Sequence, residues 1–381
     1  MTSKGKNQSF SRSINIELII NSLIDHSCSG TELAENLGLS NATVSSIIKE
    51  LNDIGIIRVS ETTSTTGLGR KRVNYEINPE YGLILGVNIS NLHASISLIN
   101  TKQEEIICSD LKVEKYDTNT MYQLVLEASK LLINETAIPL KVIVISLPGR
   151  VNAVTGELLL SKQFDKELFK EKHFIQNLFA KQFKNIPIIL ANDNNVMTVG
   201  ELNHGVLKDC NNGLYFNIDY GIGGGIIING KPYVGDLGYA GEFGLVKYYN
   251  GKDYLPIDEF ASLRALCLEA SKILNRDITR EQLIAEYERN SQIKELVLDS
   301  TSIVAETITR LADILDISKT VISGRVTNFG KEYLDKLKKE CPSNIHDMDI
   351  SFSTLGNKAV IYGTSSLGLG IMIDVIKKKY K

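Results

Sequence analysis

The chain has 381 residues, of which 43% are hydrophobic and 23% are charged, and its formal net charge is −3. This length and composition are typical of a soluble globular protein with two or three domains and large cores. The small negative charge excludes a general attraction to nucleic acid, so any DNA binding must come from a local basic surface.

Membrane insertion, export and cysteine-based structure are not expected. We find no apolar run of about 18 residues, the length that would predict a transmembrane helix. The opening segment, MTSKGKNQSFSRS, is polar and lacks the apolar core of a signal peptide. The five cysteines are scattered without a CxxC pair, which argues against a zinc cluster and a disulfide framework. We therefore predict a cytoplasmic protein that is not a membrane partner.

Residues 1–80 carry the pattern of a helix-turn-helix. The apolar spacing of INIELIINSLI predicts a first helix that ends near Asp25. The segment SGTELAENLG predicts a second helix, which Gly38 ends. After the turn GLS, Ser40 is expected to cap a third helix from about Asn41 to Ile54. The third helix is placed to be a recognition helix.

The third helix has one apolar face and one polar face. Val44, Ile47, Ile48 and Leu51 recur at helical spacing and are expected to be buried. The opposite face carries short polar groups and a lysine, which suit base edges and phosphates. The candidate DNA-binding residues on this face are Asn41, Thr43, Ser45, Ser46 and Lys49.

A β-wing is predicted after the third helix. Its strands are expected at Ile56 to Ser60 and at about Val73 to Ile77. Arg70, Lys71 and Arg72 cluster where the wing returns, and such a basic wing can follow phosphates or enter a narrow minor groove. An ordinary helical hairpin is the alternative, but cap, turn, polar face and basic wing in this order favour a winged DNA-binding domain. The segment NPEYG is expected to be a linker to the next domain.

Residues 81–381 are predicted to form an α/β domain with two lobes. Three β-rich runs, GLILGVNIS, HASISLIN and EEIICSDLKV, precede a helix near Met121 to Leu132 and the strands KVIVISLPG and IPIILAND. A second series has the strands GLYFNIDY, GIIING and TVISG, with helices at about 258–275, 280–289, 293–315 and 363–379. Strands followed by α/β alternation, occurring twice, predict two related lobes with a ligand between them.

Four stretches together carry a resemblance to a known family: GLGRKRVNYEINP, SLPGRVNAVTGELLLS, ANDNNVMTVGEL and DYGIGGGIIINGKPYVGDLGYAGEFG. Over nearly its whole length the chain resembles the repressor, open-reading-frame and kinase (ROK) family of sugar kinases and sugar-responsive repressors. The resemblance implies an actin-like ATPase-type fold with lobes at about 81–195, joined by the C-terminal helix, and at about 196–358. It also implies a homodimer or homotetramer.

The phosphate-binding half of a ROK kinase is poorly matched. Phosphoryl transfer needs loops that hold phosphate, a metal site and a base. The family's first phosphate loop, Asp-x-Gly-Gly-Thr, corresponds here to Asn88, Ile89, Ser90, Asn91 and Leu92, without the acid, the glycines or the threonine. The second loop, Gly221 to Gly225, is intact, but Tyr220 replaces the usual threonine. We therefore predict no kinase activity and no nucleotide cofactor, with the glycines allowing close backbone packing at a hinge.

The sugar-binding half is better matched, and the resemblance implies the following roles. Asn192 and Asp193 correspond to a sugar-binding pair in which the aspartate is the kinase base, here a relic. A carboxylate and a carboxamide suit a hydroxyl group, which both donates and accepts hydrogen bonds. The remaining candidate sugar-binding residues implied by the family are Gly149, Glu242 and Asp258. For Asp193 alone, a helix-start acid is the alternative.

The family's zinc site is missing from the sequence. Leu245 replaces the histidine of the family pattern, and the following stretch KYYNGKDYLPIDEF has no cysteine or histidine. We therefore predict no zinc, with this segment held by the packing of Tyr248, Tyr249, Tyr254 and Pro256. The preferred prediction is a repressor with operator DNA and a monosaccharide as partners. The alternatives are a sugar kinase with a DNA-binding module and a DNA-binding protein whose C-terminal half only oligomerises.

Overall fold

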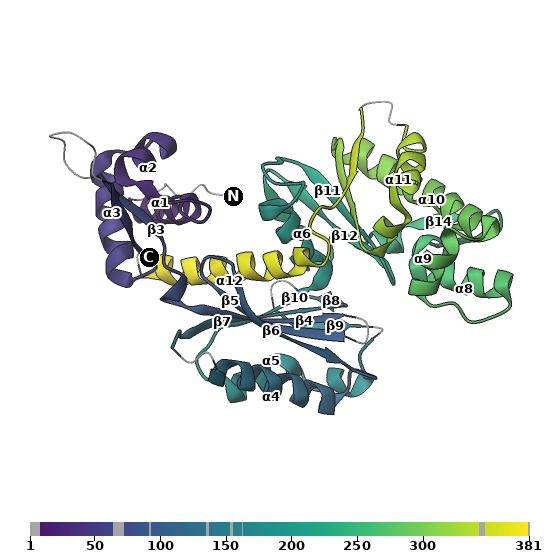
Figure 1. Ribbon diagram of the computed structural model, residues 1–381, viewed down its shortest axis with the longest axis horizontal. Helices are drawn as coiled ribbons and strands as arrows, with labels where there is room; N and C mark the ends of the chain where they lie inside the picture. The colour runs from purple at the N-terminus through teal and green to yellow at the C-terminus, as the bar shows by residue number, and fades with distance from the viewer. Residues whose placement is uncertain are drawn as a thin grey trace.

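The computed structural model describes residues 8–63, 72–90, 93–134, 137–152, 155–161, 163–342 and 347–379. These residues form an N-terminal domain and two α/β lobes. One long helix, α12 (Lys358–Lys378), runs from the N-terminal domain across the sheet of the first lobe to helix α6 (Asp193–His204) at the second lobe (Figure 1).

The N-terminal domain is a winged helix-turn-helix. Its elements are α1 (Gln8–Ser22), β1 (Cys28–Ser29), α2 (Gly30–Leu37), α3 (Asn41–Ile54), β2 (Ile57–Thr63) and β3 (Arg72–Ile77), with strand order β1-β3-β2. The local end signals predicted from the sequence are confirmed. Gly38 ends α2 in the left-handed region with φ of 63°, and the Ser40 Oγ accepts the Thr43 N–H at 3.1 Å at the start of α3.

One prediction for this domain was inaccurate, and the segment joining it to the first lobe has a defined structure. Helix α1 ends at Ser22, three residues before the predicted end, because the chain turns there to bring β1 beside β3. The segment NPEYG is ordered by a 3₁₀ turn, η1 (Pro79–Tyr81), and the Asn78 Nδ2 donates to the carbonyl oxygen of Gly55 at 2.9 Å. The join to the first lobe is therefore packed against the end of α3.

The two lobes have the same sheet topology. The first sheet has the order β10-β7-β4-β5-β6 and the second has the order β13-β12-β11-β16-β17. In each, the first three strands of the sheet are antiparallel, the fourth lies parallel beside the first, and the fifth lies parallel beside the fourth. This repetition confirms the prediction of two related α/β lobes.

Helices α4 and α5 cover one face of the first sheet, and α12 covers the other (Figure 1). The elements of this lobe are β4 (Leu83–Ser90), β5 (His93–Asn100), β6 (Glu105–Lys112), α4 (Thr118–Asn134), β7 (Leu140–Leu147), β8 (Arg150–Val151), β9 (Leu158–Leu160), η2 (Lys166–Phe169), α5 (Phe174–Gln182) and β10 (Ile188–Asn192). Its inner strands are buried on both faces, as near-continuous apolar runs predict.

The second lobe packs α6 on one face of its sheet and a helical group on the other. Its elements are β11 (Gly213–Ile218), β12 (Ile222–Ile228), β13 (Lys231–Tyr233), η3 (Phe243–Leu245), β14 (Lys247–Tyr249), β15 (Tyr254–Pro256), α7 (Asp258–Ala261), α8 (Leu263–Leu274), α9 (Arg280–Tyr287), α10 (Ser291–Leu315), β16 (Lys319–Ser323), η4 (Arg325–Phe329), α11 (Gly330–Lys339) and β17 (Asp349–Phe352). The single helix predicted at 258–275 is split. The buried Ser262 caps α8, its Oγ accepting the Ala265 N–H at 3.2 Å.

Helices α6 and α12 cross with their backbones in close contact. A Cβ atom on Gly200 of α6 would overlap the carbonyl oxygen of Ala359, and one on Gly363 of α12 would overlap the carbonyl oxygen of Val196. Glycine at both positions is what lets the two helices approach this closely. The crossing joins the first lobe to the second.

The C-terminal half of α12 belongs to the core of the DNA-binding domain. Leu369, Ile373 and Ile376 pack in one cluster with buried residues of α1 and α3. Contrary to our expectation, α12 is long and apolar enough by composition to cross a membrane. The apolar character of α12 was missed in the sequence because small and polar residues interrupt its apolar run. In the structure half of that segment is buried against other elements, as in a core helix.

Candidate functional site

Asn192 and Asp193 lie where β10 ends and α6 begins. The Asn192 Oδ1 accepts the Asn195 N–H at 3.1 Å, and the Asn192 Nδ2 donates to the Gly149 carbonyl oxygen at 2.9 Å. Asn192 therefore caps α6 and fixes the loop after β7, where Gly149 has a φ of 145°. The structure thus brings three of the predicted sugar-binding residues together at the end of the first sheet.

Asp193 is the first residue of α6 and is bonded within its own turn. Its Oδ1 accepts the Asn194 N–H at 2.9 Å and the Asn194 Nδ2 at 3.2 Å. The Asn194 Oδ1 in turn accepts the Asn217 Nδ2 from β11 at 2.9 Å. Asp193 is therefore linked through Asn194 to the sheet of the second lobe, which places the carboxylate at the junction of the lobes.

The pKa of Asp193 is raised to about 6, chiefly by burial and also by the neighbouring carboxylates of Glu242 and Asp219, while the Asn194 N–H opposes the rise. A carboxylate held in this way is costly to ionise without a ligand. A buried carboxylate whose pKa is raised by burial and by neighbouring acids is typical of functional sites.

We expect the Asp193→Asn variant to be more stable than the unchanged protein at pH 7.5 but not at pH 4.5. An unfolded aspartate has a pKa of about 3.9, so between about pH 4 and pH 6 the folded state holds a proton that the unfolded state releases. The stability contributed by Asp193 therefore falls as pH rises through that window. The gain on substitution should reach about 1–3 kcal/mol above pH 6.

Thermal unfolding at the two pH values measures this effect, and Asp253→Asn, in an exposed hairpin turn, is the control. An equal gain for Asp193→Asn at both pH values would contradict the raised pKa.

Glu242 faces Asp193 from the second lobe. It precedes η3, and Gly241 beside it has a φ of 90° and lies so close to the carbonyl group of Gly224 that a side chain would overlap it. Burial raises the pKa of Glu242, the charge of Arg150 on the first lobe lowers it, and Asp258 raises it. Glu242 and Arg150 thus carry opposite charges on the two lobes.

Asp258 is placed at the same junction but already has protein partners. Its Oδ1 accepts the Ile222 N–H at 2.8 Å, and its Oδ2 accepts the Arg264 Nη2 at 3.1 Å. These contacts join the start of β12 to α8. Asp258 therefore supports the backbone beside Glu242 and retains acceptor capacity on each oxygen for a ligand hydroxyl.

The glycine-rich stretch is mostly a strand, which corrects the predicted loop at Gly221 to Gly225. Strand β12 begins at Ile222, and Gly224 lies so close to the Tyr215 carbonyl oxygen and the Phe243 ring that no side chain fits. Gly223 and Gly225 face Asn194 and Thr198 of α6 in the same way. The glycines allow close packing of sheet, α6 and Phe243, as the alternative interpretation held.

An ionic cluster missed by the sequence analysis lies beside this strand. The Arg280 Nη1 contacts the Asp219 Oδ1 at 2.7 Å, the Arg325 Nε lies 3.8 Å from the Asp219 Oδ2, and the Arg280 guanidinium lies 5.8 Å from the centre of the Tyr220 ring. Arg325 also pairs with Glu281 at 2.6 Å. Asp219, which follows β11, could have been noted in the sequence as a candidate. Its partners Arg280 and Arg325 could not, because they are distant in the chain.

The residue that replaces the first phosphate-loop acid is used for packing. Asn88 is buried, and its Oδ1 accepts the Thr364 Oγ1 of α12 at 3.0 Å. The Ser90 Oγ donates to the His93 carbonyl oxygen at 3.1 Å, and residues 91–92 lie outside the described residues. Asn88 therefore holds α12 on the first sheet and brings no negative charge for a metal.

The loop after Glu242 is held by aromatic packing, as predicted. Strands β14 and β15 form a hairpin in which Tyr249 pairs with Tyr254, with ring centres 5.0 Å apart. Tyr248 meets Phe260 edge-on at 5.8 Å, and Pro256 lies opposite Lys247. Leu245 is exposed. Among the described residues there is no group of three His, Cys, Asp or Glu side chains that could hold a metal.

The candidate DNA-binding face is formed by α3. Asn41, Ser45, Ser46 and Lys49 are exposed, while Thr43 is half-buried and its Oγ1 lies 2.8 Å from the Ser40 Oγ in the helix cap. Arg12 of α1 also reaches this face, because its Nη2 contacts the Ser46 Oγ at 3.2 Å and the Glu50 carboxylate. The sequence did not point to Arg12. Arg70 and Lys71 lie outside the described residues, and for Arg72 only the backbone, in β3, is described.

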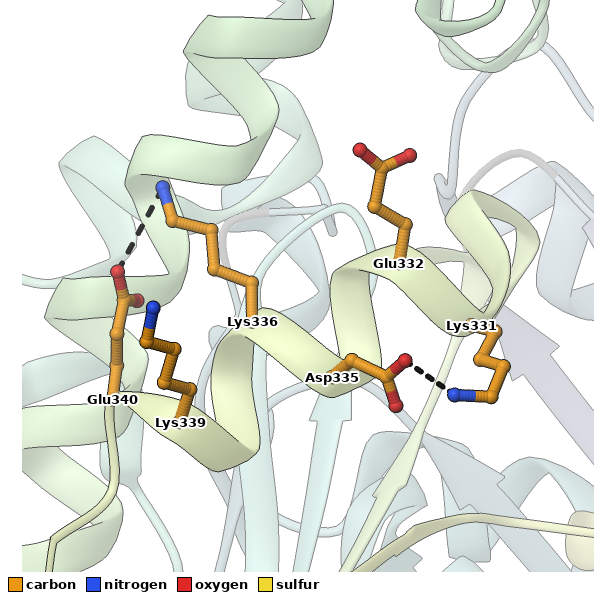
Figure 2. A pocket seen from close by; sticks show the side chains of 6 residues that line it. All are labelled: Lys331, Glu332, Asp335, Lys336, Lys339 and Glu340. Atoms are coloured by element: carbon orange, nitrogen blue, oxygen red, sulfur yellow. Dashed lines mark hydrogen bonds and ion pairs between the residues drawn. The ribbon is translucent and has the colours of Figure 1, made fainter.

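Two surface hollows lie away from the lobe junction. One is on α11 and is lined by Lys331, Glu332, Asp335, Lys336, Lys339 and Glu340 (Figure 2). Lys331 pairs with Asp335, Lys336 with Glu340, and Glu332 with Lys294. With its charges balanced and largely paired, this hollow has no evident ligand. The other lies between α1 and α12 and is lined by Phe10, Ile14, Ile371, Val375 and neighbouring residues.

Comparison with known proteins agrees with this arrangement. The ROK family model matches residues 84–369, and a winged helix-turn-helix DNA-binding model matches residues 18–58. A xylose repressor of Staphylococcus xylosus is 30% identical over 274 residues, which cover 70% of each chain.

Two solved structures share the fold. A ROK family transcriptional regulator, a homologue of the E. coli MLC protein, has a TM-score of 0.80 and 18% identity over 98% of each chain. The ROK hexokinase of Thermus thermophilus has a TM-score of 0.64 and 19% identity, covering 77% of this chain and 99% of the other. With three quarters of its residues matched by the family model, this chain belongs to the ROK family.

Proposed function

We propose that this protein is a sugar-responsive transcriptional repressor that binds operator DNA in the cytoplasm and is released by a monosaccharide. The observation that carries the proposal is the position of α12. Its first half packs on α6, which begins at Asp193, and its second half is part of the core of the winged helix-turn-helix. A change at the lobe junction therefore has a packed route to the DNA-binding surface.

The candidate effector site is the lobe junction formed by Gly149, Asn192, Asp193, Glu242 and Asp258. Carboxylates and carboxamides that keep free acceptor capacity suit a ligand with several hydroxyl groups. An acidic site disfavours an anionic ligand, so a neutral sugar is expected. The relative named xylose repressor makes D-xylose the first sugar to test.

A repressor of this kind is expected to act as a homodimer or homotetramer. A dimer would present two copies of α3 to a pseudo-palindromic operator with half-sites about one or two helical turns apart. The sugar must bind one arrangement of the two DNA-binding domains better than the other, because otherwise it shifts no equilibrium.

The test is selection of genomic DNA fragments by the purified protein, with and without D-xylose and a mixture of other pentoses and hexoses. Specific fragments that are lost when sugar is added support an inducible repressor and identify the regulated genes. Specific fragments that every sugar leaves bound would contradict the effector part of the proposal. Absence of any specific fragment would contradict DNA binding.

A sugar kinase with an added DNA-binding module is the second candidate, favoured by the fold shared with a ROK hexokinase. We propose that the chain is not an enzyme, because Asn88 replaces the first-loop acid and is bonded to Thr364. Incubation with ATP and the same sugars tests this. ATP consumption above that of an Asp193→Ala variant would overturn the non-enzyme proposal.

We expect the Arg70→Ala variant to bind all selected DNA fragments less tightly, by a similar factor for each. Its binding should also depend less on salt concentration. Loss of one phosphate contact should reduce the slope of log K against log salt by about 1. Affinities at several salt concentrations measure it. Lys331→Ala, a lysine on the distant helix α11, is the control, and an Arg70→Ala variant with unchanged affinity and slope would exclude the wing from the DNA interface.

A further inference from the structure

The turn between β5 and β6, residues 100–104, is polar, and its side chains Asn100, Thr101 and Gln103 are buried. The Gln103 N–H donates to the Asn100 carbonyl oxygen at 2.9 Å, and the Asn100 Nδ2 donates to the Glu104 carboxylate at 2.8 Å. Gln103 has a φ of 66°, in the left-handed region that non-glycine residues adopt uncommonly. Buried polar side chains must be satisfied by specific partners, so the partners of this turn are informative.

Three consecutive side chains of the turn reach different parts of the molecule. The Thr101 Oγ1 donates to the Gly82 carbonyl oxygen at 3.3 Å, at the join between the domains. The Lys102 Nζ contacts the Glu76 Oε2 in wing strand β3 at 2.7 Å. The Gln103 Oε1 lies 2.8 Å from the His204 Nε2 at the end of α6. One short turn therefore contacts the DNA-binding wing and the helix that begins at the candidate effector site.

Helix α12 meets the turn at the same point. The Ser366 Oγ lies 3.2 Å from the Gln103 Oε1. The Ser365 Oγ lies 2.9 Å from the same oxygen and 2.8 Å from the Tyr362 carbonyl oxygen, so its single hydrogen has two possible acceptors. The His204 ring stacks on Tyr362 of α12 with centres 4.5 Å apart. Because one amide oxygen faces three donors, a small movement of α6 changes which donors it keeps.

The wing side of the turn is equally specific. Glu76 accepts from both Lys102 and the Arg58 Nε of β2, the latter at 2.8 Å. These contacts lower the pKa of Glu76, and the hydrogen bond from Lys102 has the largest effect. The Lys102–Glu76 pair is only partly exposed, so its geometry is better fixed than that of a fully exposed surface pair.

We propose that the turn at residues 100–104 is the relay that couples the lobe junction to the DNA-binding wing, through Gln103 on one side and Lys102 on the other. The inference rests on the proposed function. Helix α6 is a rod of about 18 Å, so a ligand that moves Asp193 also moves His204 at the opposite end. The turn passes this movement to β3 through the Lys102–Glu76 pair. Helix α12 contacts the same turn through Ser365 and Ser366.

Hydrogen exchange of the α6 start, with and without a selected genomic DNA fragment, tests the relay without an identified sugar. Coupling between two sites is reciprocal, so DNA bound at the wing must change the exchange at Asn192 to Val196. A change of about 5-fold or more is expected for the unchanged protein.

Two variants cut the relay on opposite sides: Lys102→Met removes the ion pair to Glu76, and His204→Phe keeps the stack on Tyr362 but loses the bond to Gln103. Each is expected to bind the fragment as the unchanged protein does and to reduce the exchange response to less than about 2-fold. Lys231→Met, an exposed lysine in β13, is the control and should keep the full response. Thermal unfolding shows whether each variant is folded.

The outcomes separate the relay from the proposed function. A full exchange response in both folded variants would overturn the relay and leave the repressor intact. Loss of DNA binding in a folded variant would assign these contacts to the DNA-binding domain itself and would also overturn the relay. If the unchanged protein selects no fragment, the proposed function fails and the relay fails with it.

Discussion

Replacing Asp193 by alanine is expected to abolish the response at sugar concentrations that release the unchanged protein, while leaving DNA binding intact. The carboxylate lies at the start of α6, where burial raises its pKa to about 6, and it is remote from α3. Loss of hydrogen bonds from sugar hydroxyls to this charged group should weaken sugar binding by about 10- to 100-fold. Binding of a selected DNA fragment is measured with increasing D-xylose, or with whichever sugar releases the unchanged protein.

Two further variants make this result specific. Asp253→Ala, in the exposed β14–β15 turn, should respond to sugar normally. Asp193→Asn keeps the size of the side chain and should retain a weak response, because a carboxamide still accepts one hydroxyl. Normal release of DNA from Asp193→Ala would remove Asp193 from the effector site and would leave the site to Glu242 and Asp258.

The Gly363→Ala variant is expected to lose about 1–3 kcal/mol of unfolding free energy or more. The new methyl group would overlap the Val196 carbonyl oxygen where α12 crosses α6. Helix backbones cannot separate there without opening the contact between the lobes. Thermal unfolding measures the loss, which should lower the unfolding temperature by several degrees.

The matched control lies on the same helix. Gly370 is exposed, and no atom lies within 4 Å of the position that a methyl group would take there, so Gly370→Ala should stabilise α12 by roughly 0.5–1 kcal/mol through helix propensity. Glycine to alanine is thus expected to lower the unfolding free energy at position 363 and to raise it at position 370. A Gly363→Ala variant as stable as Gly370→Ala would show that the helices can separate without cost.

The helix-turn-helix could be predicted from the sequence because its signals are local. Ser40 and Gly38 determine helix ends by bonds within four residues, and α3 has the predicted bounds. The split at Ser262 was missed because the apolar pattern of α7 and α8 continues across the break. The first half of strand β12, up to Gly225, was taken for a loop because glycine has low strand propensity, whereas contacts with Tyr215 and Phe243 make the strand form.

The candidate site was only partly predictable. Asn192, Asp193 and Glu242 were found through the family resemblance, and the structure brings them to one junction. The salt bridge between Asp219 and Arg280 joins residues 61 positions apart, and no local sequence pattern predicts such a pair. Gln103 and His204 are 101 positions apart, and neither belongs to a motif. Long-range polar pairs of this kind depend on the fold.

The glycine crossing of α6 and α12 gives the molecule the mechanics of a lever. The point of closest contact moves least when two bodies rotate against each other, so Gly200 and Gly363 form a fulcrum. From Gly363 to Ile376, in the core of the DNA-binding domain, the arm is about 20 Å long. A rotation of about 5° at the fulcrum would displace the far end by about 2 Å, the size of the helix shifts that operate known protein switches. Because α12 is held on the first sheet, such a rotation would move the DNA-binding domain and the first lobe together relative to the second lobe.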